Sequence, residues 1–143
     1  MLLYGNNGIW LTNREASAFT AFNNGLPEGA DNLQIRGLAV TRQGQLFALG
    51  QYALFQLHDN NTWHEVSLPN DEGDRLTDIT VKGDSMVITS RSNVYVSLPP
   101  YRHFNKITLP ASQNNDGKVS LFRTIWLLHS GELFGTAGVM IVD

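Results

Sequence analysis

The 143-residue sequence predicts a mainly β fold, made of about three propeller-like units that are not all complete. Charged residues make up only 16% of the chain while hydrophobic residues make up 42%, a balance that disfavours long solvated helices. Thirteen Gly, five Pro and several Asn-Asn and Asn-Gly pairs interrupt the chain at short intervals, as expected for short strands joined by turns. The third observation is an internal repeat of about forty residues.

The repeat is clearest in two seven-residue segments that lie 41 positions apart. Trp63 to Pro69 (WHEVSLP) and Phe104 to Pro110 (FNKITLP) share an aromatic residue, a β-branched residue, a hydroxyl residue and Leu-Pro. Because Trp63 and Phe104 begin these segments, we expect them to occupy equivalent, buried positions between sheets. Further aromatic residues are predicted to pack in the same way: Trp10, Phe19, Phe22, Phe47, Phe55, Tyr95 and Trp126.

The upstream parts of the repeat align in a similar register. Residues 46–57 match residues 86–96 at a spacing of 40, and residues 35–40 resemble residues 76–81. Each full repeat therefore contains four short strands, which is the period of a propeller blade. A β-sandwich whose strands merely look alike is the alternative. The units are expected at residues 2–27, 33–69 and 76–110, and the N-terminal unit lacks its first strand.

Residues 119–143 allow two interpretations. Strands over residues 122–128, 132–135 and 139–142 would make a further incomplete unit. Alternatively, apolar residues spaced by three or four positions favour a short C-terminal helix from about Ser120 to Leu128, followed by extended chain. We expect the helix.

The repeats resemble those of the two-component-regulator type of propeller. Leu38 to Phe47 and Gly8 to Trp10 carry this similarity, as an apolar strand, a Gly turn and a Gly-apolar-aromatic strand. Gln51, Tyr52 and Ser92 stand where that family favours Gly. The resemblance implies an architecture and no activity.

A second resemblance lies in residues 121–135, which contain the string His-Ser-Gly-Glu-Leu-Phe-Gly. This segment is similar to the stretch before the last membrane helix of PepSY-associated transmembrane proteins. The resemblance implies a non-catalytic extracytoplasmic sensing or interaction domain of a bacterial membrane protein, on the periplasmic face of the inner membrane. Flanking segments would anchor it, with Met1 to Tyr4 following an earlier membrane helix.

The same resemblance makes His129 a candidate haem or metal ligand in a longer protein. This supports an alternative function, that of an accessory domain in a ferric-siderophore reductase-like membrane protein. A further alternative is a structural scaffold for self-association. Within the fragment itself, the sequence predicts no cofactor and no metal site, because there is no Cys and because His58, His64 and His103 lack the spacing of a ligand set.

Charge and motifs narrow the remaining functions. The net charge is −3 and no two basic residues are adjacent, so nucleic-acid binding is not expected. No nucleophile elbow and no phosphate-binding loop is present, so the fragment is not expected to be an enzyme. The acidic segment 70–74 is interpreted as a solvated turn.

A recognition tip is the one binding site that the sequence suggests. Tyr101, Arg102 and His103 follow Pro99-Pro100, and a Pro-Pro turn is expected to project their side chains. The ligand or protein partner is not identified. The strand count also predicts a homodimer, because three and a half blades would leave one sheet face uncovered.

Overall fold

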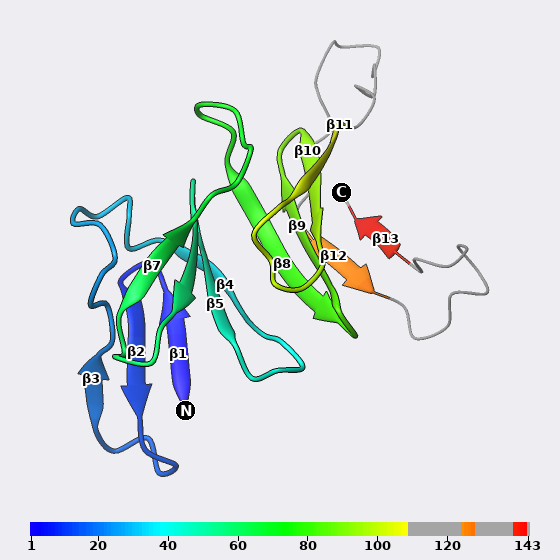
Figure 1. Ribbon diagram of the computed structural model, residues 1–143. Helices are drawn as coiled ribbons and strands as arrows, with labels where there is room; N and C mark the ends of the chain where they lie inside the picture. Colours follow the sequence, from blue (N-terminus) through cyan, green and yellow to red (C-terminus); the bar gives the residue numbers. More distant parts are fainter. Residues whose placement is uncertain (109–123, 128–138, 143) are drawn as a thin grey trace.

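The computed structural model describes residues 1–108 in full and the backbone of Thr124–Leu127 and Val139–Val142. All regular elements in these ranges are strands, which confirms the predicted mainly β class. The strands form antiparallel sheets that follow one another in chain order, as a row (Figure 1). The row is open, and the described residues do not form a closed propeller.

The sheets are built from strands that are neighbours in sequence. The first sheet contains β1 (Leu2–Gly5), β2 (Gly8–Thr12) and β3 (Phe19–Ala21). The second contains β4 (Ile35–Val40), β5 (Leu46–Gly50), β6 (Leu54–Leu57) and β7 (Trp63–Val66). The third contains β8 (Leu76–Lys82), β9 (Ser85–Ser90), β10 (Asn93–Ser97) and β11 (Asn105–Thr108). The fourth pairs β12 (Thr124–Leu127) with β13 (Val139–Val142).

The second and third sheets share an irregularity at one position of the repeat. The register of β4 against β5 shifts between Ile35 and Gly37, and that of β8 against β9 shifts between Leu76 and Asp78. These pairs lie 41 positions apart in the sequence. A bulge at the same place in both first strands shows that the repeat extends to backbone geometry.

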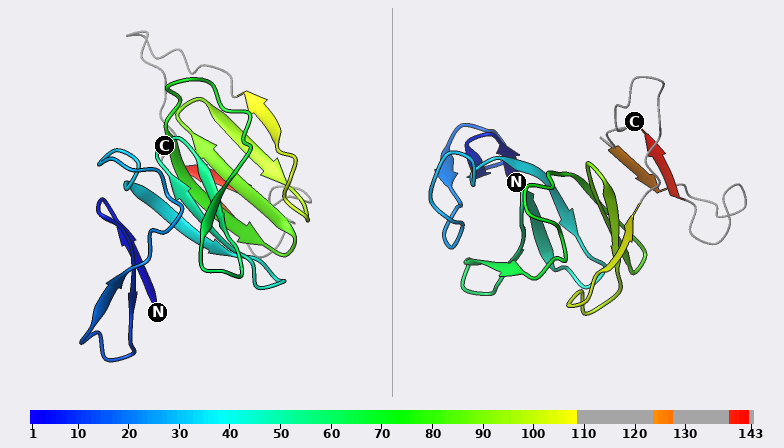
Figure 2. Two further views of the ribbon diagram at one scale, coloured as in Figure 1. Left: turned by 60° about the vertical axis from the view of Figure 1, so that its left-hand side comes forward. Right: turned by 90° about the horizontal axis from the view of Figure 1, so that it is seen from above.

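Two cores join the first three sheets. The core between the first and second sheets consists of Ile9, Leu26, Ile35, Ala48, Phe55 and Trp63. The core between the second and third sheets consists of Ala39, Phe47, Leu49, Leu54, Leu76, Ile79, Met86, Ile88, Tyr95, Tyr101 and Phe104. We call the face of a sheet that packs on the preceding sheet its near face, and the other its far face. Two further views show the sheets as successive layers (Figure 2).

The near faces of the second and third sheets are equivalent. Trp63 of β7 lies opposite Leu57 of β6. In the third sheet, Asn105 of β11 pairs with Val96 of β10, and Phe104 precedes Asn105 by one position, which places it beside Ser97. Both rings are buried, each in the core shared with the preceding sheet. The prediction that Trp63 and Phe104 are equivalent and buried is confirmed.

The predicted C-terminal helix is wrong over Thr124–Leu127, because these residues form strand β12. It pairs antiparallel with β13, with Thr124 opposite Val142 and Leu127 opposite Val139. The apolar spacing that suggested a helix also fits a strand, since Thr, Ile and Trp favour β structure and pairing with β13 adds cross-strand contacts. β12 lies against β8, as β8 lies against β4. The rest of the predicted helix lies outside the described residues.

Candidate functional site

A polar cavity lies between the second and third sheets, at their outer rim. It has a volume of about 450 Å³. Its polar lining comes from both units and includes Gln45, Gln56, His58, His64, Glu65, Ser67 and Arg102. We call this cavity the rim groove. A second cavity of about 590 Å³ shares Gln45, Gln56 and His58 with it, so the groove continues along the second sheet.

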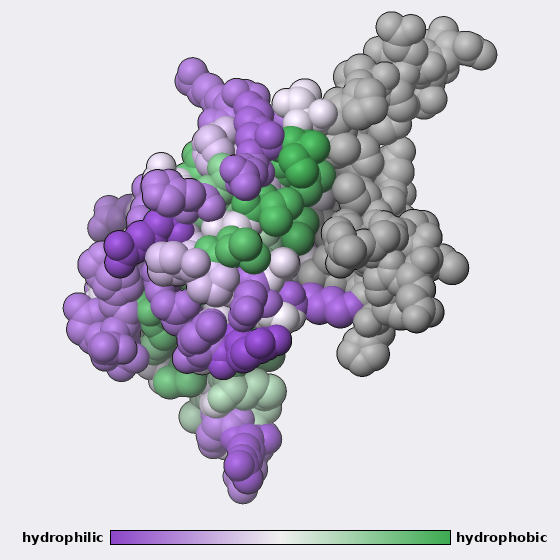
Figure 3. All heavy atoms as spheres, turned by 45° about the vertical axis from the view of Figure 1, so that its right-hand side comes forward, coloured by the Kyte–Doolittle hydropathy of each residue, from purple (hydrophilic) through white to green (hydrophobic). Residues whose placement is uncertain are grey.

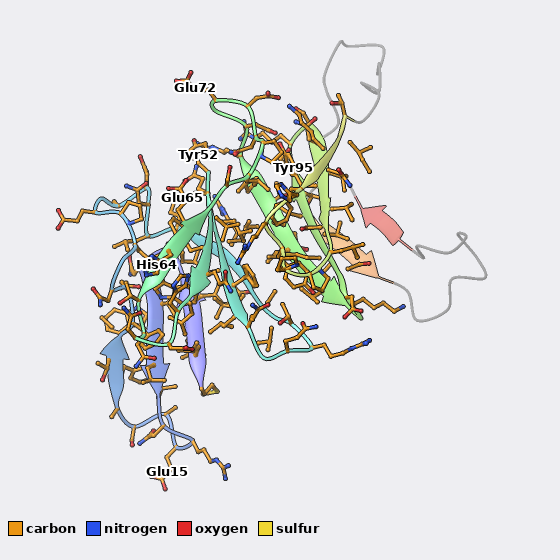
Figure 4. The ribbon with its side chains drawn as sticks, in the orientation of Figure 1. Glu15, Tyr52, His64, Glu65, Glu72 and Tyr95 are labelled. Atoms are coloured by element: carbon orange, nitrogen blue, oxygen red, sulfur yellow. The ribbon has the colours of Figure 1, made fainter. Side chains whose placement is uncertain are left out.

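The β6–β7 hairpin places the two histidines of the rim groove side by side. His64 lies opposite Gln56 in the pairing of β7 with β6, and His58 follows β6 directly. Their imidazole rings stack with centroids 3.9 Å apart and an interplanar angle of 23°. Figure 4 shows His64 and Glu65 together on β7. The sequence predicts His58 and His64 to be surface residues of one unit without the spacing of a ligand set, and the short hairpin between them is the signal for their proximity.

The predicted recognition tip is divided by the structure. Arg102 and His103 are exposed, and Arg102 lines the rim groove. Tyr101 is buried, so the prediction that its side chain projects from the turn is wrong. Whether Arg102 and His103 bind a ligand stays a prediction.

The backbone of Tyr101 explains why its ring points inward. Its φ is 61°, in the left-handed region, which turns the chain back after Pro100. The ring packs edge to face on Phe47, with centroids 5.7 Å apart, and its hydroxyl donates to the backbone oxygen of Asp84 at 2.9 Å. Burial, together with the charge of Asp84, raises the pKa of Tyr101. Tyr101 therefore anchors the turn that presents Arg102.

A second polar cluster lies at the end of the third sheet and surrounds the carboxylate of Asp74. Its Oδ2 accepts hydrogen bonds from Ser90 Oγ at 2.5 Å, Asn93 Nδ2 at 3.0 Å and the Tyr95 hydroxyl at 3.3 Å. Burial, together with the charge of Asp74, raises the pKa of Tyr95 to about 12. The carboxylate is the common acceptor of these three donors, and the Ser90 hydroxyl also lies 3.3 Å from the backbone oxygen of Asn93, so this cluster has a structural role.

The acidic loop 70–74 is therefore only partly the solvated turn that the sequence predicts. Asp71 is exposed and pairs with Lys106, whose Nζ lies 2.8 Å from both carboxylate oxygens. The hydrogen bond and positive charge of Lys106 hold the pKa of Asp71 below its ordinary value. Asp74, three residues later, points into the third sheet.

The described part of the chain contains no group of three or more His, Asp or Glu side chains that could hold a metal ion. Over the same described residues, there is no helix long and apolar enough to cross a membrane. His129 lies outside the described residues. On the face drawn in Figure 3, most visible side chains are hydrophilic, and hydrophobic side chains gather beside the region drawn in grey.

Comparison of the chain with protein-family models, with curated proteins and with solved structures finds no match.

Proposed function

We propose that the chain is a non-catalytic interaction domain that binds an acidic segment of a partner protein in the rim groove. One observation carries this proposal: Arg102 and the stacked pair His58 and His64 line the same cavity. These side chains come from two successive units of the repeat. The groove therefore depends on the packing of the second sheet on the third.

The chemistry of the rim groove favours a carboxylate ligand. A guanidinium binds carboxylates through two parallel hydrogen bonds, and Arg102 has no carboxylate partner among the described residues. Imidazole N–H groups and the amides of Gln45 and Gln56 can donate further hydrogen bonds. Glu65 is the one acidic residue of the lining, so an anionic ligand would seat towards Arg102. The cavity volume lies within the usual range for ligand sites.

We further propose that the sheets are blades of a β-propeller that one chain leaves open. The four-stranded sheets, their common bulge and their equivalent near faces support this architecture. In such folds each blade packs face to face on its neighbours, and binding residues lie at the edges between blades. The position of the rim groove between two sheets agrees with that arrangement.

The cellular setting that we propose is the periplasmic side of a bacterial inner membrane, in a PepSY-associated membrane protein. The similarity of residues 121–135 to that family supports it. The sequences on either side of this chain in its gene test the proposal. Apolar stretches of about twenty residues are expected there, and polar flanks would contradict a membrane anchor.

Binding to the rim groove can be tested by nuclear magnetic resonance. We expect hexaglutamate to shift the amide signals of residues 56–66 and 100–103 in a saturable way, whereas hexalysine leaves them unchanged. Arg102→Gln should weaken hexaglutamate binding at least tenfold. Arg91→Gln, which removes an exposed guanidinium outside the groove, is the matched control and should bind like the parent chain. Equal weakening by both variants, or no shifts with hexaglutamate, would refute the proposal.

A further inference from the structure

The near face of the first sheet repeats the pattern of the near faces that the next two sheets bury. In the first sheet, Leu3 lies opposite Trp10. The equivalent pairs are Ala48 with Phe55 in the second sheet and Ile88 with Tyr95 in the third. Phe19 lies opposite Thr12 and takes the place of Trp63 and Phe104.

The exposure of these positions separates the first sheet from the other two. The near-face residues of the second and third sheets are between 0% and 8% exposed: Ala48, Phe55, Trp63, Ile88, Tyr95 and Phe104. Leu3 is 41% exposed, Trp10 36% and Phe19 53%. Tyr4 and Leu11 are also exposed, but the strand pairing places them on the far face with Ile9. The first sheet thus presents two aromatic residues and a leucine to solvent where its successors contact a preceding sheet.

Within the chain, two near faces are covered, and each is covered by the far face of the preceding sheet. The far face of the first sheet covers the second sheet, and the far face of the second covers the third. The row continues with β12 against β8 and β9. The β12–β13 sheet and the β1–β3 sheet lie at opposite ends of the row (Figure 1), so they do not meet within one chain.

We propose that the near face of the first sheet, carrying Leu3, Trp10 and Phe19, is an interface for a second copy of this chain. The β12–β13 sheet of the second copy packs on it, in the head-to-tail order of the sheets within the chain. The interface continues the sheet contact that the chain already makes between its own units. Two copies related in this way bring eight sheets together, which is within the range of four to eight blades of closed propellers. Twofold pairing buries both copies of the exposed face.

Sedimentation equilibrium of the chain at micromolar concentration tests the association. The expected mass is twice the 15.9 kDa of one chain. Trp10→Ser and Phe19→Ser should each give 15.9 kDa species, with circular dichroism spectra that remain those of a β protein. Leu98→Ser removes an apolar side chain that is 61% exposed in a turn of the third unit, and this control should stay dimeric. A monomeric parent chain would overturn the proposal, and so would dimeric Trp10→Ser and Phe19→Ser variants.

The head-to-tail order has its own test, because the chain has no cysteine. Ala21 lies opposite Trp10, on the near face of the first sheet, and position 140 lies on β13. A mixture of Ala21→Cys and Met140→Cys chains should form a cross-linked heterodimer with a short bismaleimide. Cross-linking of Ala21→Cys chains with each other instead would show that two first sheets meet, and this would overturn the head-to-tail order. The groove variant Arg102→Gln should dimerise like the parent chain, so the outcome is independent of the proposed ligand.

Discussion

The indole Nε1 of Trp63 donates a hydrogen bond of 2.8 Å to the backbone oxygen of Phe22, and the two rings meet edge to face with centroids 6.2 Å apart. Trp63 of the second unit thus makes both an apolar contact and a hydrogen bond with the end of the first unit. The backbone N–H of Trp63 also donates to the backbone oxygen of Asn24, at 2.8 Å. Trp63 therefore connects the second sheet to the segment that follows the first sheet.

Trp63→Ala is expected to lower the free energy of unfolding by about 3–5 kcal/mol, because it leaves a cavity in the first core. Trp63→Phe keeps most of the ring but removes the donor to Phe22, and it should cost about 1–3 kcal/mol. Urea unfolding followed by circular dichroism measures both. Val40→Ala, at an exposed site, is the control and should change stability by less than about 0.5 kcal/mol. Equal stability of Trp63→Ala and the control would contradict the role of Trp63 in the core.

Gly25 is expected to tolerate no side chain. Its φ is 91°, and a Cβ atom there would overlap the backbone oxygen of Trp63. Gly44 has a similar φ of 82° but nothing within 4 Å of a Cβ atom, so it isolates the cost of conformation alone. Gly44→Ala should cost about 1–2 kcal/mol, and Gly25→Ala should cost clearly more in the same urea unfolding experiment. The reverse order would show that the first and second sheets do not meet as described.

Asp74→Ala should destabilise the third sheet, because Ser90, Asn93 and Tyr95 would lose their common acceptor. A loss of about 3 kcal/mol or more is expected, since each buried donor left unpaired costs about 1–3 kcal/mol. Glu72→Ala, two residues earlier on the exposed part of the same loop, should change thermal stability little. Differential scanning calorimetry separates the two variants, and a small effect for Asp74→Ala would mean that water replaces the carboxylate.

Stability should fall at alkaline pH through Tyr95, whose pKa in the folded chain is raised to about 12 by burial and by the charge of Asp74. A raised pKa means that the folded state holds the phenol proton more tightly than the unfolded state. The contribution is therefore complete below pH 10, the ordinary pKa of tyrosine, and is lost as the pH rises to about 12. Urea unfolding at intervals between pH 9 and pH 12 should show this loss. Tyr95→Phe should flatten that part of the profile, and an unchanged profile would contradict the assignment.

The repeat could be predicted from the sequence because its matched residues serve the same packing contact. Trp63 and Phe104 recur at 41 positions, and each is buried against the preceding sheet. Trp10 and Phe19 carry the same pattern and are exposed. The residue types predict which face of a sheet packs on a neighbour. They do not identify the neighbour, because it is not adjacent in the sequence.

Other features depended on contacts that no local pattern contains. Asp74 sits in an acidic loop that is expected to be solvated, yet it accepts hydrogen bonds from residues 16 to 21 positions away. Tyr101 follows two prolines, and its left-handed backbone directs the ring inward. The rim groove is lined by residues of two units. The sequence therefore identifies its histidines and Arg102 as separate residues but does not predict that they form one site.

The two separate cores also determine how the molecule should come apart. The first core holds the first sheet to the second and shares no residue with the second core, which holds the second sheet to the third. Chains with this nearest-neighbour organisation behave as a one-dimensional series of coupled units. In a chain that has not dimerised, amide hydrogen exchange should accordingly reveal opening of β1–β3 at a lower free energy than opening of β9 and β10. These two are the inner strands of the third sheet, with a hydrogen-bonded strand on each side and many buried residues. In a chain that has not dimerised, fraying that begins at the β1–β3 end leaves the rim groove assembled while this terminal sheet exchanges freely with solvent.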